Sequence, residues 1–453
     1  MPVSRGLKLF SIVVFILLPI YSHAQYPYLG MQTSWRKSMV SATMNPAEIN
    51  NLHRKVEVGF FATNAVISTN TLSFGQMVNN TNDLWDNLIS EASGNIQGTT
   101  EGTVMIPSVG IKLNKWSVGL LSQAYISGNI IDINADLGRH ITDNRNSLNS
   151  TSFGIDNPQN QRIAGSTWVE TGLIIGREIW NNKNSKLSLA GNFKMVYPIN
   201  YNNIGVDAFQ GVLIRDGSEI TISDASASIN LIYNRDLVDF RSLDFDYSNL
   251  TFENPSGFGL DFGVNWQLKN ERGVWLNSGL AVRNIGKVKF GDNFTAHNFT
   301  MNIPEGNDFN IDVLNTDLEN VRTVFMESDF FSFTSSQEGF EVYLPTVLAI
   351  NGDMKISEIF YLSFYGQTFI QNKNFEFQIP NANIVSLIPS AIFGKFEVYS
   401  PWTYFDISNL TVGLGFRYGG FFIGSHSILS GVIADTNKLD VHAGLNWSFG
   451  RVQ

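Results

Sequence analysis

Residues 439–449 read Leu-Asp-Val-His-Ala-Gly-Leu-Asn-Trp-Ser-Phe, and this stretch decides the fold. Successive side chains of a β-strand point to opposite faces, so the segment has one apolar face and one face of polar residues and glycine. A helix would instead need apolar residues three and four positions apart. The pattern therefore predicts a strand whose apolar face consists of Leu439, Val441, Ala443, Leu445, Trp447 and Phe449.

The same alternation recurs along the chain, for example at residues 257–268 and 411–418. The alternating segments run for about 10 to 15 residues, which suits a tilted strand that crosses a bilayer and exceeds the ~5–6 residues usual in soluble sheets. Aromatic residues gather near the segment ends, where a barrel would meet the lipid headgroups. A β-sandwich or propeller also alternates, but its strands would be shorter. A membrane barrel whose apolar faces contact lipid is therefore favoured.

About fourteen such segments can be counted, an even number as expected for a single-chain bacterial barrel. The count treats residues 219–233, 257–268 and 390–399 as one strand each. The short turn near residues 269–272 then falls on the side that should carry long loops, so one strand is missed or one element is misassigned. The predicted fold is all-β, a single transmembrane antiparallel β-barrel of about 14 strands, within a range of 12–16.

Composition excludes several classes of function. The 453-residue chain has a net charge of −10, and only 15% of its residues are charged, whereas 13% are aromatic. No basic surface for nucleic acid is expected from this balance. The absence of cysteine excludes disulfides, thiolate catalysis and cysteine-ligated metal centres.

Motifs of catalysis and of metal binding are also missing. No two of the histidines after the first 25 residues have the spacing of metal ligands, and the Gly-x-Gly phrases precede no helix. No Gly-x-Ser-x-Gly nucleophile motif occurs. The sequence therefore predicts no enzyme, no cofactor and no bound metal. The histidines concerned are His53, His140, His297, His426 and His442.

The N-terminus has the pattern of a secretory signal peptide over residues 1–24. Arg5 and Lys8 precede the apolar run Leu9–Ile20, and cleavage is predicted between Ala24 and Gln25. This run is too short for a membrane-spanning helix, which needs about 20 residues, and no later apolar run approaches that length. The prediction is an export signal, followed by an N-terminal segment at residues 25–55 and one barrel domain at residues 56–453.

The strand pattern has its largest interruption at residues 289–343, which is predicted as a long insert in the barrel. An outer loop, a plug in the lumen and a periplasmic insert remain open as its location. Within it, residues 317–330 have apolar side chains at helical spacing, which predicts a short amphipathic helix. Those side chains are Leu318, Val321, Val324 and Phe325.

Four phrases of the sequence resemble an uncharacterised outer-membrane barrel family of Bacteroidota, a family labelled only as a domain of unknown function. They are Gly-Phe-Gly-Leu-Asp-Phe-Gly at 257–263, Ser-Gly-Leu-Ala-Val-Arg-Asn-Ile-Gly at 278–286, Tyr-Leu-Pro-Thr at 343–346 and Val-Gly-Leu-Gly-Phe-Arg-Tyr-Gly-Gly-Phe at 412–421. The resemblance covers nearly all of the chain after the signal peptide. That family is similar in layout to long-chain fatty-acid transporters.

Asn45-Pro46-Ala47 resembles the Asn-Pro-Ala phrase that fatty-acid transporters and the type IX secretion shuttle barrel carry at the N-terminal entry to the barrel. The Gly/Ala-rich lead-in and the acidic residue of the transporters are replaced here by residues 35–39, Trp-Arg-Lys-Ser-Met. The resemblance implies an N-terminal plug within residues 25–55. From the residues alone, Pro46 moves Asn45 out of the helical region and ends any preceding helix, as in an ordinary turn before a strand.

The expected location is the cell outer membrane, in contact with its lipid. The expected function is a passive or facilitated conduit for hydrophobic small molecules. The alternative is a non-conducting barrel scaffold for cell-surface or secretion-apparatus partners, that is, for other envelope proteins. One facing test follows: Leu445→Arg should cost about 2–4 kcal/mol at the bilayer midplane, whereas Asn446→Arg, on the opposite and wet face, should be tolerated.

Overall fold

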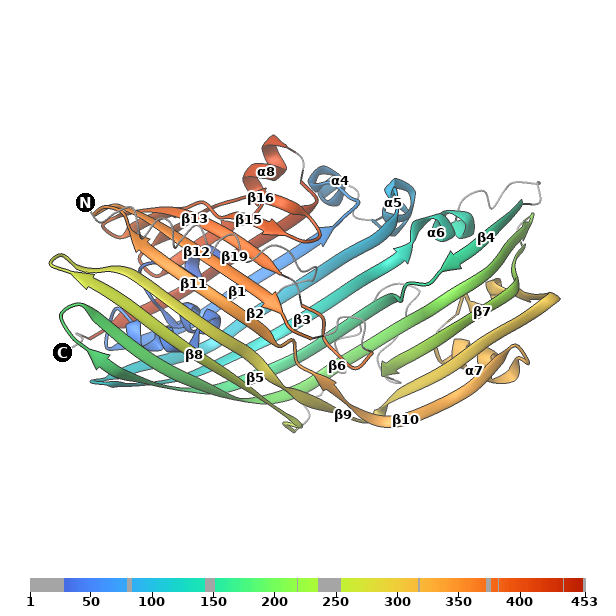
Figure 1. Cartoon of the computed structure of the whole chain (residues 1–453), viewed down its shortest axis with the longest axis horizontal. Coiled ribbons are helices and arrows are strands. Elements are labelled where there is room, and N and C mark those ends of the chain that lie inside the picture. Colours follow the sequence, from blue (N-terminus) through green and yellow to red (C-terminus); the bar gives the residue numbers. More distant parts are fainter. Residues whose placement is uncertain are drawn as a thin grey trace.

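A computed structural model of the chain describes residues 28–79, 84–142, 151–217, 219–234, 254–316, 318–371, 376–381, 383–434 and 436–450. The expected signal peptide, with Ala24 and Gln25, lies outside these residues. In the described part, nineteen strands form one antiparallel sheet. The first strand, β1 (Val56–Thr69), pairs both with β2 (Asn95–Leu113) and with the last strand, β19 (Lys438–Phe449), so the sheet closes into a barrel (Figure 1). Closure satisfies the backbone groups that an open sheet edge would expose to lipid.

Five pairs of consecutive strands lie end to end in the barrel wall, so the nineteen strands occupy fourteen positions around it. We call each of these positions a stave. β7 (Glu219–Asn234) and β8 (Gly257–Asn270), for example, both pair with β6 (Ser185–Asp216) and with β9 (Gly273–Asn310). The predicted all-β barrel of about fourteen antiparallel strands is confirmed. The other strands are β3 (Trp116–Asn134), β4 (Thr151–Asn157), β5 (Gln161–Asn181), β10 (Phe331–Tyr343), β11 (Val347–Lys355), β12 (Phe360–Phe369), β13 (Ile384–Phe393), β14 (Phe396–Tyr399), β15 (Trp402–Phe405), β16 (Asn409–Val412), β17 (Leu414–Tyr418) and β18 (Phe421–Ser425).

Two assignments from the sequence were wrong and compensate each other in the count. Residues 219–233 and 257–268, counted as two strands, lie in the single stave β7–β8. Residues 390–399, counted as one strand, belong to two staves, because the chain turns back between β13 and β14 at Gly394, whose φ of +58° lies in the region that favours glycine. With β7 and β8 in one stave, the short turn after β8 no longer falls on the wrong side.

Among the described residues, the long connections all lie at one end of the barrel, which also carries the short turns from β6 to β7 and from β15 to β16, whereas the other end carries short turns alone. Turns of two to four residues join β2 to β3, β5 to β6, β8 to β9, β11 to β12, β13 to β14 and β17 to β18. We call this the short-turn end and the opposite end the long-loop end; in outer-membrane barrels these are the periplasmic and the extracellular ends. The long-loop end carries the helices α4 (Phe74–Asn79), α5 (Leu84–Glu91), α6 (Ala135–Thr142), η4 (Ile311–Leu314), α7 (Leu318–Glu327) and α8 (Ile428–Ile433).

The wall is much taller on one side than on the other. β6 and β9 have 32 and 38 residues, whereas β12 and β13 have ten each and β18 has five. A tilted strand needs only about 9–11 residues to cross a bilayer, so the tall side projects beyond it. We call the projecting part the distal sheet; it consists of β4, β7 and the adjoining halves of β6, β9 and β10, which extend to the right in Figure 1.

The stretch expected as an insert, residues 289–343, is occupied by the far half of β9, by η4, by α7 and by β10. Because β9 and β10 pair with each other over 287–301 and 331–343, this stretch extends the barrel wall at the long-loop end. The helix predicted within residues 317–330 is α7. No helix among the described residues is long and apolar enough to cross a membrane.

The side of the wall that carries the apolar residues changes along the height of the barrel. We call this change the reversal of sidedness. In β8 the outward side chains are apolar and exposed, including Phe258, Phe262 and Trp266, and the inward ones are polar or glycine. In β7 the outward Ser226 and Ser228 are exposed, and the inward residues are apolar and buried. An outward apolar face suits acyl chains and an outward polar face suits water, so the reversal marks the level at which the wall leaves the bilayer.

Candidate functional site

The N-terminal segment, residues 28–52, lies inside the barrel near its short-turn end. It contains α2 (Leu29–Gln32), α3 (Met39–Met44) and the 3-10 helix η1 (Pro46–Asn51), nearly all of them buried. The segment contacts inward residues of staves all around the wall. The Tyr28 hydroxyl donates to the Ala62 carbonyl of β1 at 2.9 Å, and a side chain at Gly176 of β5 would overlap Asn50.

The Asn-Pro-Ala phrase forms the junction between α3 and η1. Asn45 has an extended backbone, as Pro46 requires of the residue before it, and its side chain caps η1 by accepting from the Ala47 N–H at 3.0 Å. The Asn45 amide also donates to the Val264 carbonyl of β8 at 3.0 Å. A Cβ atom at Gly263, also on β8, would overlap the Asn45 side chain, so the phrase packs directly on the wall.

Glu48, three residues after Asn45, is the one acidic residue of residues 28–52, and the sequence analysis did not identify it as a site residue. Its carboxylate is fully buried and accepts four amide hydrogen bonds of 2.8–3.1 Å. Hydrogen bonds to an ionised acceptor are the strong ones in proteins. A signal existed, because three neighbouring staves each place an inward asparagine at this level. The donors are Asn51 of the segment itself, Asn265 of β8, Asn277 of β9 and Asn351 of β11.

Lys37 completes the attachment of the segment to the wall. Its ammonium donates to the Asp353 carboxylate of β11 at 2.5 Å and lies 3.9 Å from Glu48. Burial alone would lower the pKa of Lys37, but the carboxylates of Asp353 and Glu48 outweigh it and raise the pKa above its ordinary 10.5. The ammonium therefore stays charged at neutral pH. We call the set Lys37, Asn45, Glu48, Asn265, Asn277, Asn351 and Asp353 the latch.

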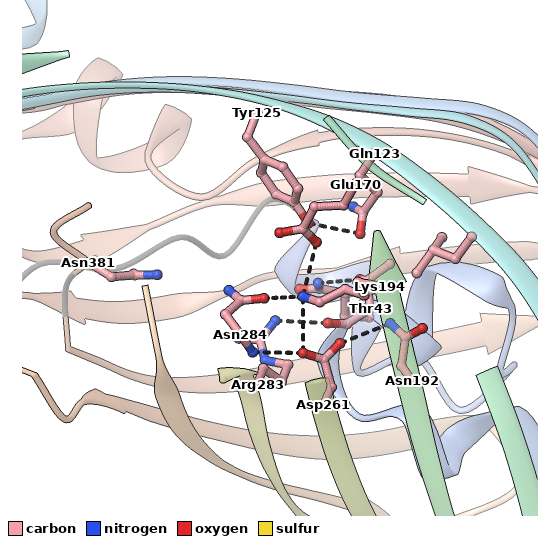
Figure 2. A pocket seen from close by; sticks show the side chains of 12 residues that line it. Thr43, Gln123, Tyr125, Glu170, Asn192, Lys194, Asp261, Arg283, Asn284 and Asn381 are labelled. Carbon is pink, nitrogen blue, oxygen red and sulfur yellow. Dashed lines mark hydrogen bonds and ion pairs between the residues drawn. The ribbon is translucent and has the colours of Figure 1, made fainter. Parts of the chain in front are cut away.

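A charged layer lies next to the latch, because Asp261 of β8 is farther from the short-turn end than Asn265 of the latch. Figure 2 shows its side chains Glu170, Lys194, Asp261 and Arg283 around a small pocket. Lys194 of β6 lies 3.0 Å from Glu170 of β5 and 3.0 Å from Asp261 of β8. Arg283 of β9 donates to the Thr43 carbonyl of the N-terminal segment at 2.8 Å. The two cations and two carboxylates balance, so this layer has no net charge. The small pocket that they line is polar.

An aromatic layer follows farther from the short-turn end. Tyr125 and Trp168 stack with ring centroids 4.8 Å apart, and the Trp168 indole N–H donates to Glu170 of the charged layer at 3.0 Å. Phe290 and Phe294 meet edge to face at 4.9 Å. The layer is a contiguous buried cluster, whose members include Tyr201, Phe340, Val342 and Leu344.

A cluster of buried apolar side chains packed against one another covers the inner face of the distal sheet beyond the aromatic layer, and we call this cluster the apolar chamber. The chamber is covered by α7, whose buried residues Leu318, Val321 and Phe325 pack on the sheet. The Phe325 ring stacks on Phe331 of β10 at 4.2 Å and meets Phe299 of β9 at 5.3 Å. From the short-turn end to the long-loop end, the lumen thus passes from latch to charged layer, aromatic layer and apolar chamber.

On β19, the outward side chains are those of the apolar face expected to meet lipid. Val441, Trp447 and Phe449 are exposed, and Leu439, Ala443 and Leu445 are partly exposed. The inward Asn446 is buried and donates to Ser38 of the N-terminal segment at 3.3 Å. The expectation that Asn446 lies on a wet face is therefore wrong, because the N-terminal segment rather than water occupies that side of the strand. From this burial we expect Asn446→Arg to be destabilising rather than tolerated.

Three potential metal ligands, which form no motif in the sequence, come together in the structure. His426, Asp440 and His442 place their ligand atoms within 4.8 Å of one another, all three buried. The separation of residues 426 and 440 along the chain does not indicate this contact, because it depends on the pairing of β18 with β19. Among the described residues, this is the group that could hold a metal ion.

A closed barrel of fourteen antiparallel staves, with an apolar outer band and short turns at one end, defines an integral outer-membrane β-barrel protein. Within this class, the chain belongs to the family described as "Family of unknown function (DUF5723)", whose model matches residues 46–426. No curated protein matches the sequence.

Several solved structures are similar to this chain. The toluene transporter TodX of Pseudomonas putida is 8% identical with a TM-score of 0.43, over 94% of this chain and 99% of that one. The toluene transporter TbuX of Ralstonia pickettii is 9% identical with a TM-score of 0.38, over 90% and 92%. A Pseudomonas aeruginosa FadL homologue is 11% identical with a TM-score of 0.27, over 95% and 98%.

Proposed function

We propose that this barrel is a conduit for hydrophobic small molecules across the outer membrane, in which residues 28–52 serve as a plug. The observation that carries the proposal is the lining of the lumen. From the long-loop end inward, the inner face is first apolar and then aromatic. The interior of a water-filled porin is polar, so this lining favours a solute that leaves water and enters an apolar site.

The charged layer and the latch would then act as the barrier to free diffusion. The charged layer pairs Lys194 with Glu170 and Asp261, so it offers no excess charge to attract an ion. The latch holds the N-terminal segment by buried hydrogen bonds to β8, β9 and β11. Passage of a solute to the short-turn end would require the segment to shift, because it fills this part of the lumen.

The proposal can be tested by locking the plug. The chain has no cysteine, so Ser38→Cys and Asn446→Cys, introduced at two residues in hydrogen-bond contact, provide one pair that joins the segment to β19. The measurement is uptake of radiolabelled toluene by cells that express the protein in an intact outer membrane. We expect uptake above that of cells without the protein, and loss of this excess when the pair is oxidised.

Two controls make this result specific. The reduced double variant should take up toluene like the wild type, and oxidation of either single variant should change nothing. Uptake by the wild type that equals that of cells without the protein would overturn the conduit. Equal uptake by the oxidised and reduced double variants would contradict the movement of the plug but not the conduit itself.

A second candidate function is a scaffold that presents the distal sheet to other envelope proteins. It is favoured by the height of β6 and β9, which far exceeds what a bilayer requires. Cross-linking from the exposed Val313 and Met326, each replaced by a photoreactive residue, should then capture one partner in stoichiometric amount. Capture of no stoichiometric partner from either position contradicts the scaffold.

A further inference from the structure

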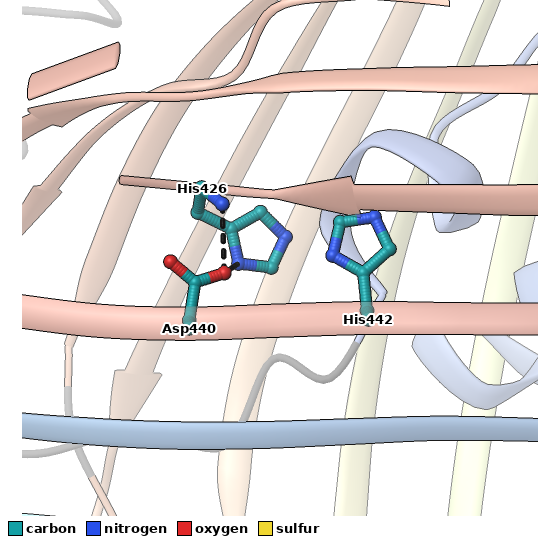
Figure 3. Close-up of side chains that lie close together, drawn as sticks. All are labelled: His426, Asp440 and His442. Atoms are coloured by element: carbon teal, nitrogen blue, oxygen red, sulfur yellow. Dashed lines mark hydrogen bonds and ion pairs between the residues drawn. The ribbon is translucent and has the colours of Figure 1, made fainter. Parts of the chain in front are cut away.

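Three buried side chains on and next to the last two strands form a compact group of metal-ligating residues. Asp440 and His442 point inward from alternate positions of β19, and His426 directly follows β18. Gly424 of β18 pairs with His442, so the chain that leaves β18 returns His426 over Asp440. Figure 3 shows the three side chains side by side. The exposed fractions of His426, Asp440 and His442 are 0%, 5% and 1%.

The carboxylate of Asp440 is held in place by four donors or potential donors. Its Oδ2 accepts from the His426 backbone N–H at 2.7 Å and faces the His426 Nδ1 at 2.9 Å. Its Oδ1 accepts from the Ser427 hydroxyl at 2.6 Å and from the Ser425 hydroxyl at 3.2 Å. Outer hydrogen bonds of this kind orient the carboxylate ligands of metal sites.

The imidazole of His442 is oriented in the same way. Its Nε2 lies 2.7 Å from the Tyr399 hydroxyl of β14, whereas its buried Nδ1 has no hydrogen-bond partner in the described chain. In Figure 3 a ring nitrogen of His442 points toward His426 and Asp440. A buried polar atom without a partner is costly, and a metal-binding histidine typically bonds a second group through its other nitrogen. A cation held between these three residues would supply the missing partner.

We propose that His426, Asp440 and His442 form a binding site for a divalent first-row transition metal, with Zn²⁺ as the reference ion. Two imidazole nitrogens and one carboxylate oxygen suit Zn²⁺, Ni²⁺ or Co²⁺, whereas Ca²⁺ and Mg²⁺ need more oxygen ligands. Around a tetrahedral ion with metal–ligand distances of about 2.0–2.2 Å, two ligand atoms lie about 3.3–3.6 Å apart. The three ligand atoms, which lie within 4.8 Å of one another here, must therefore move closer together on binding. The ion would tie the chain after β18 to β19, where the pairing of these strands ends at Gly424 and His442.

The test uses the full chain, folded in detergent and freed of metal by a chelator. Titration with ZnCl₂ in a calorimeter should show one saturable equivalent. Asp440→Asn and His442→Gln should each weaken binding at least tenfold. Loss of a residue that only hydrogen-bonds a metal ligand already lowers affinity about tenfold, so loss of a ligand should cost at least as much. His140→Gln, which removes an exposed histidine remote from the group, should bind like the wild type. Absence of a saturable equivalent, or equal binding by wild type, Asp440→Asn and His442→Gln, would overturn the proposal.

A second measurement needs no variant and so does not depend on whether the variants fold. Ligands that bind only the folded state raise the temperature of unfolding. ZnCl₂ should raise the unfolding temperature of the metal-free wild type, and CaCl₂ or MgCl₂ at the same concentration should not. No rise with ZnCl₂, or an equal rise with all three salts, contradicts a transition-metal site.

Discussion

Lys37 of the N-terminal segment donates a hydrogen bond of 2.5 Å to Asp353 of β11, across 316 positions of the sequence, and both side chains are buried. This contact joins the interior segment to the wall. Removing one partner of a buried ion pair leaves the other charge without compensation, which is far more costly than losing an exposed pair.

Asp353→Asn should therefore lower the free energy of unfolding by about 3–5 kcal/mol. The matched control is Glu341→Gln, which breaks the exposed contact between Lys287 and Glu341 and should destabilise the protein far less than Asp353→Asn. Urea unfolding of the two variants in the same detergent measures the difference. Equal losses of stability would mean that the Lys37–Asp353 pair does not anchor the segment.

The contribution of Lys37 should depend on pH in a defined direction. Its pKa is raised above the ordinary 10.5 by Asp353 and Glu48, despite burial. A raised pKa stabilises the folded state fully below the unfolded-state value and loses this contribution as the pH rises through the folded-state value. The stability difference between wild type and Lys37→Met should thus stay constant from pH 7 to about pH 10 and shrink above it. A difference that already shrinks between pH 7 and pH 9 contradicts this assignment.

Gly279→Ala should destabilise the contact of Asn45 with the wall. A Cβ atom there would lie 2.8 Å from the Val264 carbonyl oxygen and 2.7 Å from the Asn351 amide oxygen, and it would overlap the Asn45 amide. Overpacking of this kind costs about 1–3 kcal/mol. Gly352→Ala is the control, because a Cβ atom at this strand glycine meets nothing within 4 Å. Urea unfolding should place Gly352→Ala within about 0.5 kcal/mol of the wild type.

Phe325→Ala should loosen α7 from the apolar chamber. The ring is buried and stacks on Phe331, so its loss should cost about 3–5 kcal/mol of local stability. Trypsin cleavage after Arg322, within α7, should become faster while the barrel stays folded. Met326→Ala alters the exposed side of the same helix and should leave the cleavage rate unchanged. If Met326→Ala accelerates cleavage as much as Phe325→Ala, α7 is not held by the chamber.

Leu445→Arg should cost about 2–4 kcal/mol if this outward position lies at the bilayer midplane. The proper comparison is Ser226→Arg, since Ser226 is exposed on the outer face of the distal sheet, where the wall is polar. This substitution should change stability by less than about 0.5 kcal/mol. Folding into lipid vesicles measures both effects. Similar costs would show that the reversal of sidedness does not mark the edge of the bilayer.

The alternation in the sequence predicted the class of fold because it is a local property of each strand. Segments such as 257–268 and 439–449 carry two distinct faces whatever their neighbours are, and their length suits a bilayer. The number of staves was right through two compensating differences, since no local signal shows that 219–233 and 257–268 share a stave. The latch could be predicted only in part. Asn45-Pro46-Ala47 was identified by its resemblance to a known phrase, whereas Glu48 belongs to no motif that could be recognised in the sequence.

The sequence by itself determined that this protein has long two-faced strands, no cysteine chemistry and no helix-spanning pattern, because each of these depends on composition or on neighbouring residues. Only the tertiary structure decided where the apolar face turns from lipid to the inside of the barrel. The apolar face of β8 points to lipid, whereas that of β7 points into the lumen, because the same period of two fits either environment. The tertiary structure alone also joined Lys37 to Asp353 and His426 to Asp440, because pairing between distant strands brings these residues together.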